Sequence, residues 1–486
     1  MNPVRRLLLV RTNPWRPRTG DSPPLGCLHL ASAVRKWLDP SITIRLINMH
    51  ASRISFRDLS TLYGEFKPDV VGFSALSMEH GDLMEAVARC KGWDSNVLTV
   101  VGGPHATMFG DILAREPDID VVVRGEGEYT FVELLRTYAD GGDFSSVDGL
   151  VYEAEGSITE TPVRTMESDL DRLPYPAWDL LDFPAYVRSN NMNGLLAASP
   201  YMTVMTTRAC PFKCIYCHQL FGTRFKQRSV NHIMTELETL YHEYGIREIQ
   251  FVDDCFNLNR PRAKTIADEI VKRGLKFRIA FPNGIRGDLM DVELIEKLRD
   301  AGAYMITYAV ETANERLQKL LRKDLDLGRV SEAIETTYEK GVIPAGFFML
   351  GIPTETREEM ENTIRYACSS RILKAYFFTV VPFPRTELYE LAKRIYPEMA
   401  LKEADISEAH SYWSPNPYYA RATGIDTVAV QREAYRRFYF DPVRIYRILR
   451  RFPKNRHILN GIFYGLQASF GLVERFNRLR SQSVTR

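Results

Sequence analysis

The sequence predicts an α/β protein with two parallel sheets: an N-terminal doubly wound sheet, then a partial (βα)6 barrel of the TIM type, followed by a helical C-terminal extension. Three observations favour this fold class. Two series of short apolar runs alternate with helical patterns, a Pro-rich aromatic stretch separates the two series, and basic charge is concentrated at the end of the chain. At 486 residues the chain is long enough for roughly two to four domains.

Residues 1–145 carry five short apolar runs of strand length with helical patterns between them. Continuous apolar strands with interposed helices are typical of a parallel sheet covered on both faces, as in Rossmann-like or flavodoxin-like domains. Ligands of such sheets bind at the carboxyl ends of the strands, where glycine-rich turns follow. The predicted strands are Leu7–Val10, Ile42–Ile47, Val70–Ser74, Leu98–Val101 and Val121–Val123, and the predicted helices are Leu28–Leu38, Leu83–Trp93 and Tyr129–Tyr138.

Residues 146–199 connect the two series. The alternation over residues 147–164 predicts a β-hairpin with its turn at Glu155-Gly156. Residues 173–178 are rich in proline and aromatic residues, which predicts a packed linker rather than a flexible one.

Residues 200–395 hold six further strand–helix units, enough for a partial or complete parallel barrel. The chemistry of such barrels lies at the carboxyl ends of the strands. The predicted strands are Met202–Met205, Ile249–Val252, Phe277–Phe281, Met305–Val310, Pro344–Leu350 and Ala375–Val380, and the predicted helices include Ile233–Tyr244, Asp291–Ala301 and Val330–Lys340.

Residues 396–486 form a basic, mostly helical region. From Gln431 to the C-terminus 13 Lys or Arg stand against three acids, a net charge of +10, while the whole chain carries only +2. The remainder is therefore acidic, which argues against nucleic-acid binding. Arginines interleave with apolar residues over 444–452, so we expect an amphipathic helix that closes the barrel, contacts an acidic partner or docks on an anionic membrane surface.

No apolar run approaches the roughly 20 residues that span a bilayer. The sequence therefore predicts a cytoplasmic protein, and contact of the basic tail with the inner membrane surface is the peripheral alternative.

Three of the seven cysteines crowd into eight residues after the first strand of the second series. The CxxxCxxC spacing lets Cys210, Cys214 and Cys217 ligate three irons of a cuboidal cluster, and no fourth cysteine lies nearby in the sequence, so one iron stays open. A Cys3His zinc site that includes His218 and a set of three buried, inert thiols are the alternatives. The remaining cysteines, predicted to be core residues, are Cys27, Cys90, Cys255 and Cys368.

With an aromatic residue before its third cysteine, this loop resembles that of the radical S-adenosylmethionine superfamily, over about residues 200–395. The resemblance implies a 4Fe–4S cluster that cleaves S-adenosylmethionine reductively into a 5′-deoxyadenosyl radical. Arg385 stands where the family commonly has glycine. The other segments that carry the resemblance are Phe251–Phe256 (FxDDxF), Tyr308–Thr312, Phe348–Thr356 and Pro382–Tyr389 (PxPGTxLY).

The resemblance also implies where S-adenosylmethionine binds. In the family, the amino acid end of this cofactor chelates the open iron, and an acidic residue at a strand end accepts hydrogen bonds from its ammonium or ribose. Asp254 and Glu311 are the candidates, with a solvated carboxylate as the alternative for Glu311. Gly351 would let the backbone approach the adenine closely, and Pro353 would contact S-adenosylmethionine from the same loop. Tyr216 would pack beside the cluster or the adenine.

Four segments within residues 20–130 resemble the cobalamin-binding domains fused to many radical enzymes. The resemblance implies that these loops form a platform for the flat corrin and that the glycines admit its nucleotide tail. The residues it assigns to cobalamin are Pro24, Leu25, Gly26, Ser74, Leu76, Gly102, Gly103, Pro104, His105, Gly125, Glu126 and Gly127.

The domain lacks the DxHxxG motif that supplies an axial histidine in base-off, His-on cobalamin proteins. His105 stands in a different context, so we expect a contact to the nucleotide tail or a plain loop histidine before an axial ligand. The lower face of the cobalt would then be five-coordinate or covered by a bulky group such as Leu76 or Met78. A flavodoxin-like domain with another ligand, or with none, is the alternative.

Together these resemblances imply a cobalamin-dependent radical enzyme. The main hypothesis is methylation of an unactivated carbon by methylcobalamin. The alternatives are radical ring formation or rearrangement, as in the anaerobic magnesium-protoporphyrin ester cyclase group, and a cobalamin- or redox-sensing protein that performs no chemistry. The expected partners are a small-molecule substrate, lipid-like or tetrapyrrole, and an external one-electron reductant, with no nucleic acid.

Overall fold

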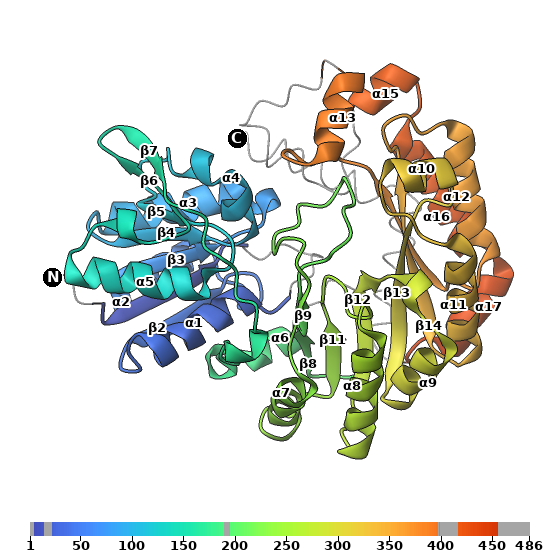
Figure 1. Cartoon of the computed structure of the whole chain (residues 1–486), viewed down its shortest axis with the longest axis horizontal. Coiled ribbons are helices and arrows are strands. Elements are labelled where there is room, and N and C mark those ends of the chain that lie inside the picture. The colour runs from blue at the N-terminus through green and yellow to red at the C-terminus, as the bar shows by residue number, and fades with distance from the viewer. Residues whose placement is uncertain (1–3, 14–21, 189–194, 397, 399–416, 455–486) are drawn as a thin grey trace.

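The computed structural model describes residues 4–13, 22–188, 195–396, 398 and 417–454. Two α/β lobes lie side by side, the N-terminal lobe in blue and teal and the second in green to orange (Figure 1). Among the described residues, no helix is long and apolar enough to cross a membrane.

The first lobe is built on a doubly wound sheet in the strand order β2-β1-β3-β4-β5-β6-β7. Successive residues of β1 (Arg6–Arg11) point to opposite faces of the sheet and pack in two different hydrophobic cores. Leu7 and Leu9 pack with α1 (Leu25–Trp37) and α5 (Gly127–Asp140), whereas Leu8 and Val10 pack with the helices of the other face. The remaining parallel strands are β2 (Thr43–Asn48), β3 (Val70–Ser74), β4 (Leu98–Gly102) and β5 (Val121–Val123), and the other face carries α2 (Phe56–Phe66), α3 (His80–Trp93) and α4 (Pro104–Leu113).

The predicted hairpin is confirmed as β6 (Leu150–Ala154) and β7 (Ser157–Glu160), with Glu155 and Gly156 at positive φ in the turn. β6 pairs antiparallel with β5, so the hairpin extends the first sheet. The sheet therefore continues past residue 145, where the sequence placed the end of the first domain. Strand periodicity identifies a hairpin but does not show which sheet it joins.

The linker beyond the hairpin is packed, as its composition predicts. Trp178 is buried in the core of the second lobe together with Leu28 of α1. Phe183, in α6 (Phe183–Arg188), stacks on Tyr244 with ring centroids 4.9 Å apart. The linker and α1 thus join the two lobes through shared apolar packing.

The second lobe is an open, curved sheet in which each strand is parallel to its neighbours, in the order β15-β14-β13-β12-β11-β8, with helices on its outer side (Figure 1). β8 and β15 are the edges of this sheet, so the fold is the partial barrel that the sequence predicts. The strands are β8 (Tyr201–Val204), β11 (Glu248–Phe251), β12 (Arg278–Ile285), β13 (Ala303–Glu311), β14 (Ile343–Leu350) and β15 (Lys374–Thr379), and the helices on the outer side are α7 (Val230–His242), α8 (Arg260–Lys272), α9 (Val292–Asp300), α11 (Leu327–Glu339) and α12 (Arg357–Ser369).

The helix α16 (Thr427–Tyr439) covers the β15 edge of the barrel. The amides of Ala375 and Phe377 donate to the hydroxyls of Tyr439 and Tyr435, each at 3.1 Å. The Gln431 side chain donates to the Phe377 carbonyl at 2.5 Å. These side chains satisfy backbone groups that an edge strand leaves unpaired, so this part of the C-terminal region covers the β15 edge of the open barrel. The predicted continuation beyond residue 454 lies outside the described residues.

Candidate functional site

The three clustered cysteines lie on a loop held at its base by a short antiparallel ladder. β9 (Thr207–Arg208) pairs with β10 (Lys226–Gln227), and residues 209–225 form the loop between them. Ile215 fixes the middle of the loop, because its amide donates to the Leu321 carbonyl at 3.1 Å and its carbonyl accepts from the Leu388 amide at 2.9 Å. The cysteines are therefore presented by a loop anchored in the barrel.

All three thiols are free of disulfides, and Cys217 is exposed while Cys210 and Cys214 are half-buried. Hydrogen bonds from the Cys255 thiol and the Phe212 amide lower the pKa of Cys210 to about 7, so its thiolate is accessible near neutral pH. Burial raises the pKa of Cys214. Three soft thiol donors on one anchored loop fit the ligand set of an iron–sulfur cluster.

The zinc alternative requires His218 as a fourth ligand. Its Nε2 lies 3.3 Å from the Pro384 carbonyl, and its ring packs on Phe383 with centroids 5.3 Å apart. Within the described ranges, no three His, Cys, Asp or Glu side chains are gathered as around a single metal ion.

Cys255 is a neighbour that the sequence did not reveal. It follows β11, is buried as expected, and donates a hydrogen bond from its thiol to Cys210. No fourth cysteine lies nearby in the sequence, but Cys255 lies beside Cys210 in space, because the β11 end meets the start of the cysteine loop. Its position directly after Asp254, at a strand end, was the available signal.

The structure brings the predicted acidic residues together with the cysteine loop. Glu311 ends β13, is buried, accepts a hydrogen bond from the Tyr216 hydroxyl at 3.2 Å, and lies 3.5 Å from Lys323. Asp254 accepts from the Ala209 amide at 3.0 Å, directly beside Cys210. Glu311 has φ +65°, a conformation that non-glycine residues hold only where their surroundings fix it, which is often at functional sites.

Asp253, in contrast, has a structural role, because its carboxylate binds the backbone and hydroxyl groups that follow the neighbouring strand. Its Oδ1 accepts from the Thr206 amide at 2.7 Å and from the Thr206 and Thr207 hydroxyls at 2.8 Å. Burial raises the pKa of this carboxyl. Asp253 thus holds the end of β8 against the end of β11, beneath the cysteine loop.

Both the packing and the backbone conformation at position 351 require glycine. Its φ is +86°, and an added Cβ would lie 2.9 Å from the Thr427 side chain of α16. Its amide donates to the buried carboxyl of Glu355 at 2.6 Å. Pro353 is buried in the same loop. Contact of Gly351 or Pro353 with adenine stays a prediction.

The loops assigned to cobalamin meet at the carboxyl edge of the first sheet. Ser74 ends β3, Gly102 ends β4, and Gly125 follows β5. The Thr107 hydroxyl links two of these loops, because it donates to the Gly103 carbonyl and accepts from the Gly125 amide, each at 3.0 Å. Gly103 has φ +88°, and an added Cβ would lie 2.7 Å from the Ser74 hydroxyl.

Three other glycines around this edge leave open space. An added Cβ would meet nothing within 4 Å at Gly26, and its nearest neighbours would be 4.0 Å away at Gly102 and Gly125. Such a cradle fits a large flat ligand. Pro24 is buried just before α1, and Leu25, Pro104 and Gly127 are half-buried at helix starts on this lobe.

His105 is buried inside the first lobe. Its Nε2 lies 3.0 Å from His80 Nδ1, and its Nδ1 lies 3.1 Å from the Ser77 hydroxyl. Both ring nitrogens therefore have partners within the domain. Met78 is 43% exposed nearby while Leu76 is half-buried, so Met78 is the bulkier accessible group for the predicted lower face.

Glu126, assigned to cobalamin, belongs to a cluster of charges between the lobes. It lies 2.6 Å from Lys226 and 3.2 Å from Arg208, while Glu128 lies 2.5 Å from Arg208. All four side chains are at most 8% exposed. Sequence reasoning missed Arg208 and Lys226, because nothing local indicates that they reach the other lobe.

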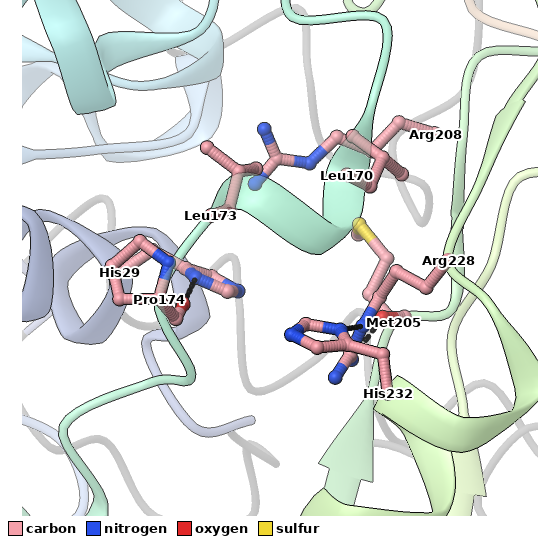
Figure 2. A pocket seen from close by; sticks show the side chains of 8 residues that line it. All are labelled: His29, Leu170, Leu173, Pro174, Met205, Arg208, Arg228 and His232. Atoms are coloured by element: carbon pink, nitrogen blue, oxygen red, sulfur yellow. Dashed lines mark hydrogen bonds between the residues drawn. The ribbon is translucent and has the colours of Figure 1, made fainter.

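A cavity lies beside this cluster, between α1, the linker and the second lobe (Figure 2). His29 contacts the Pro174 carbonyl at 3.2 Å, and Arg228 donates to His232 at 2.9 Å. Desolvation, aided by the neighbouring arginines, lowers the pKa of His29 and of His232 to about 4. Both imidazoles are therefore neutral at pH 7. The residues lining the cavity are His29, Leu170, Leu173, Pro174, Met205, Arg208, Arg228 and His232.

Comparisons with known proteins agree with this architecture. The radical SAM superfamily matches residues 204–367, and the B12 binding domain matches residues 16–135. An uncharacterized methyltransferase of Pyrococcus horikoshii, PH0819, is 35% identical over 373 residues, which cover 76% of this chain and 78% of that protein.

Two further comparisons concern a curated relative and a solved structure. The anaerobic magnesium-protoporphyrin IX monomethyl ester cyclase of Cereibacter sphaeroides is 28% identical over 76% of this chain and 60% of its own length. The solved structure of the radical S-adenosylmethionine methyltransferase TsrM from Kitasatospora setae, with cobalamin and a 4Fe–4S cluster, superposes with a TM-score of 0.67 at 20% identity, over 81% of this chain and 78% of that one.

The two domain matches, one on the open barrel that carries the three-thiol loop and one on the doubly wound domain, identify an enzyme of the radical type with a corrin partner domain. The chain belongs to the cobalamin-dependent radical S-adenosylmethionine methyltransferase family, to which the ester cyclases are related. Its cofactors are accordingly a 4Fe–4S cluster, S-adenosylmethionine and cobalamin.

Proposed function

We propose that this enzyme methylates an unactivated carbon of a largely apolar small molecule bound on the concave face of the barrel. The bound cofactors supply a carbon-centred radical and a transferable methyl group. Cys210, Cys214 and Cys217 would hold the cluster, while Tyr216, Asp254 and Glu311 would surround the S-adenosylmethionine. The observation that supports the choice of substrate is the aromatic lining of the concave face.

That lining comes from alternate residues of two neighbouring strands. Phe348 and Phe377 face the outer helices, so Phe347, Tyr376 and Phe378 face the concave side, where each is half-buried. Phe347 and Tyr376 are register partners with ring centroids 5.3 Å apart, and Tyr376 stacks on Phe378 at 6.0 Å. Half-buried aromatic rings provide apolar and π contact for a hydrophobic substrate.

Gly284 leaves space for this lining. Its φ is +95°, and an added Cβ would lie 3.2 Å from the Cβ of Ala309 and 3.4 Å from the Phe347 ring. Ala309 and Phe347 are register partners on β13 and β14. The small residues thus let the Phe347 ring lie over two strands and broaden the apolar surface.

Lys374 adds a polar group below the aromatic rings. Its ammonium lies 5.0 Å from the Tyr376 ring centroid, and burial lowers its pKa to about 7. The aromatic lining therefore suits a lipid-like or tetrapyrrole substrate.

The charged residues near the cysteine loop would bind S-adenosylmethionine rather than the substrate. Tyr216 and Lys323 both contact Glu311 Oε1, so Oε2 would be left to accept from a bound ammonium or hydroxyl. Asp254 is tied to the loop through the Ala209 amide, so its carboxylate keeps a fixed place relative to Cys210. These contacts would orient a bound S-adenosylmethionine.

The test is anaerobic reconstitution with iron, sulfide and cobalamin, followed by turnover with methyl-labelled S-adenosylmethionine. The probes are magnesium-protoporphyrin IX monomethyl ester and a polycyclic lipid carboxylate. We expect label in product, with both S-adenosylhomocysteine and 5′-deoxyadenosine formed. Phe347→Ala should raise KM, while the solvent-side Val271→Ala should not. Turnover that yields 5′-deoxyadenosine and unlabelled product would contradict methylation.

Ring formation is the second candidate, because the ester cyclase of Cereibacter sphaeroides is a relative. It predicts 5′-deoxyadenosine without S-adenosylhomocysteine, and a product that has lost hydrogen and gained no methyl group. The same reconstitution therefore separates the two reactions.

We also propose peripheral contact with an anionic membrane through α17 (Pro442–Arg451). On its inner face Ile448 is buried together with Arg444, which donates to the Cys368 carbonyl at 2.6 Å, while four apolar side chains are exposed on its outer face. An exposed apolar face flanked by arginines is typical of interfacial helices. The exposed fractions are 55% for Val443, 40% for Ile445, 63% for Tyr446 and 53% for Leu449.

The substitution Leu449→Glu tests this contact and leaves α16 intact. We expect reduced co-sedimentation with phosphatidylglycerol vesicles and little binding of either protein to phosphatidylcholine. Equal binding of the variant and the wild type to anionic vesicles would end the membrane hypothesis.

A further inference from the structure

We propose that two sets of charged contacts between the lobes fix the distance between the corrin and the cluster: the buried set Glu126, Glu128, Arg208 and Lys226, and the exposed pair Asp111 and Arg385. This inference rests on the cobalamin and cluster sites described above. Arg208, Lys226 and Arg385 are thereby positioning residues, which act through the loops that they hold.

The buried set joins the two cofactor loops at their bases. Arg208 and Lys226 are register partners in the β9–β10 ladder, and Arg208 lies two residues before Cys210. Glu126 is the N-cap of α5, and Glu128 lies in its first turn, directly after the Gly125 loop. The contacts of 2.5 to 3.2 Å therefore connect the stem of the cysteine loop to the loop assigned to the nucleotide tail.

The charges of the buried set also cancel, and the set is hydrogen-bonded to the linker. Two carboxylates meet two cations, and the Glu126 carboxylate accepts from the Glu167 amide at 3.0 Å as well. A buried charge that loses its partner is strongly unfavourable, so the four groups hold only one arrangement of the lobes well. Ion pairs of this kind specify geometry more than they add stability.

The exposed pair joins the two lobes at a second place. The Arg385 guanidinium donates to both carboxylate oxygens of Asp111, at 2.7 and 2.9 Å, and to the Met108 carbonyl. It also lies 5.1 Å from the Phe109 ring centroid. Asp111, Met108 and Phe109 belong to α4, which begins at the Gly103 loop.

Arg385 holds this contact in an unfavourable backbone conformation. Its φ is +65°, in the left-handed region that glycine adopts without strain. Its position before α13 (Glu387–Ile395) is the one where the family segment commonly has glycine. Arg385 thus makes its contacts with the other lobe in a backbone conformation that glycine would adopt without strain, so the arginine serves the contact rather than the turn.

The inference is tested by pulsed electron paramagnetic resonance on the reconstituted holoenzyme. The reduced cluster and cob(II)alamin are both paramagnetic, so their dipolar coupling reports their separation. We expect one narrow distance distribution for the wild type, and a broadened or shifted one for Glu128→Gln and for Arg385→Gly. Arg385→Gly relieves the positive φ, so this variant should fold normally.

Two controls separate positioning from general destabilisation. Glu236→Gln disrupts the equally buried Arg228–Glu236 pair, which lies wholly within the second lobe, and should leave the distance distribution unchanged. The exchange Arg385→Asp with Asp111→Arg should restore the wild-type distribution in part. Cleavage of S-adenosylmethionine by dithionite without substrate should stay at the wild-type rate in Arg385→Gly.

The coupling of that cleavage to methyl transfer should fall, since a displacement of about 1 Å between reacting groups costs roughly 10²-fold. Wild-type distance distributions in both Glu128→Gln and Arg385→Gly would overturn the inference while leaving the proposed function intact. A wild-type protein that takes up no cobalamin or no cluster would overturn both.

Discussion

Glu355, in the loop after β14, should make the protein less stable as pH rises toward 8. Burial raises the pKa of this carboxyl from its ordinary 4.5 to about 8. Between these values the folded protein keeps a proton that the unfolded chain has released. The free energy of unfolding therefore falls with rising pH across this window, which is the reverse of the usual behaviour of a carboxyl.

The size of the effect follows from the pKa difference. Each pKa unit corresponds to about 1.4 kcal/mol, so the change from 4.5 to about 8 amounts to roughly 5 kcal/mol between pH 4 and pH 9. The Gly351 and Ile352 amides, which donate to Glu355 Oε2 at 2.6 and 3.0 Å, favour the anion and oppose part of the desolvation. Glu355→Gln keeps an acceptor for both amides and has no proton to lose.

The assay is urea unfolding of Glu355→Gln and wild type between pH 5 and pH 8, followed by circular dichroism. We expect the stability difference in favour of the variant to grow by several kcal/mol, roughly 3 to 5, over this range. Glu359→Gln is the matched control, because hydrogen bonds from Arg316 lower the pKa of Glu359 to about 2. Its contribution is present above pH 4.5 and lost only toward pH 2, so that variant should run parallel to wild type between pH 5 and pH 8. Parallel curves for Glu355→Gln would refute the reasoning.

Three further predictions concern the cofactor sites. Cys255→Ala should retain a 4Fe–4S cluster on anaerobic reconstitution but shift its paramagnetic resonance g values, because Cys210 loses a hydrogen bond; loss of the cluster would instead make Cys255 a ligand. Gly103→Ala should weaken cobalamin binding by about tenfold in a titration, since strain of order 1–3 kcal/mol falls on this loop; unchanged affinity would count against the cradle. Tyr216→Phe should weaken S-adenosylmethionine binding by about fivefold through loss of one hydrogen bond to Glu311, and an unaltered Kd would remove Glu311 from that site.

Sequence periodicity was sufficient for most of the sheet strands. The run Leu7–Val10 predicted the centre of β1, and Pro344–Leu350 that of β14, because buried parallel strands are continuous apolar runs. The cysteine spacing likewise identified the loop, since three thiols within eight residues can reach the irons of one cluster from a single loop.

Contacts between distant elements could not be predicted in this way. The hairpin joins β5 through backbone hydrogen bonds that carry no residue signature. Cys255 meets Cys210 only because β11 lies beside β8, and Glu126 meets Lys226 only because the two lobes face each other. The resemblance of residues 124–128 to cobalamin-binding segments indicated a loop, but it did not show that the Glu126 carboxylate contacts the barrel.

The central claim is that three thiolates leave one iron of the cluster free for S-adenosylmethionine. Electron–nuclear double resonance on the singly reduced protein, with S-adenosylmethionine labelled with 15N in its amino group and 17O in its carboxylate, measures this directly. We predict hyperfine coupling of both labels to the cluster, in wild type and in Cys255→Ala alike. A cluster that shows no coupling to either label, or a protein that takes up zinc in its place, would contradict the account.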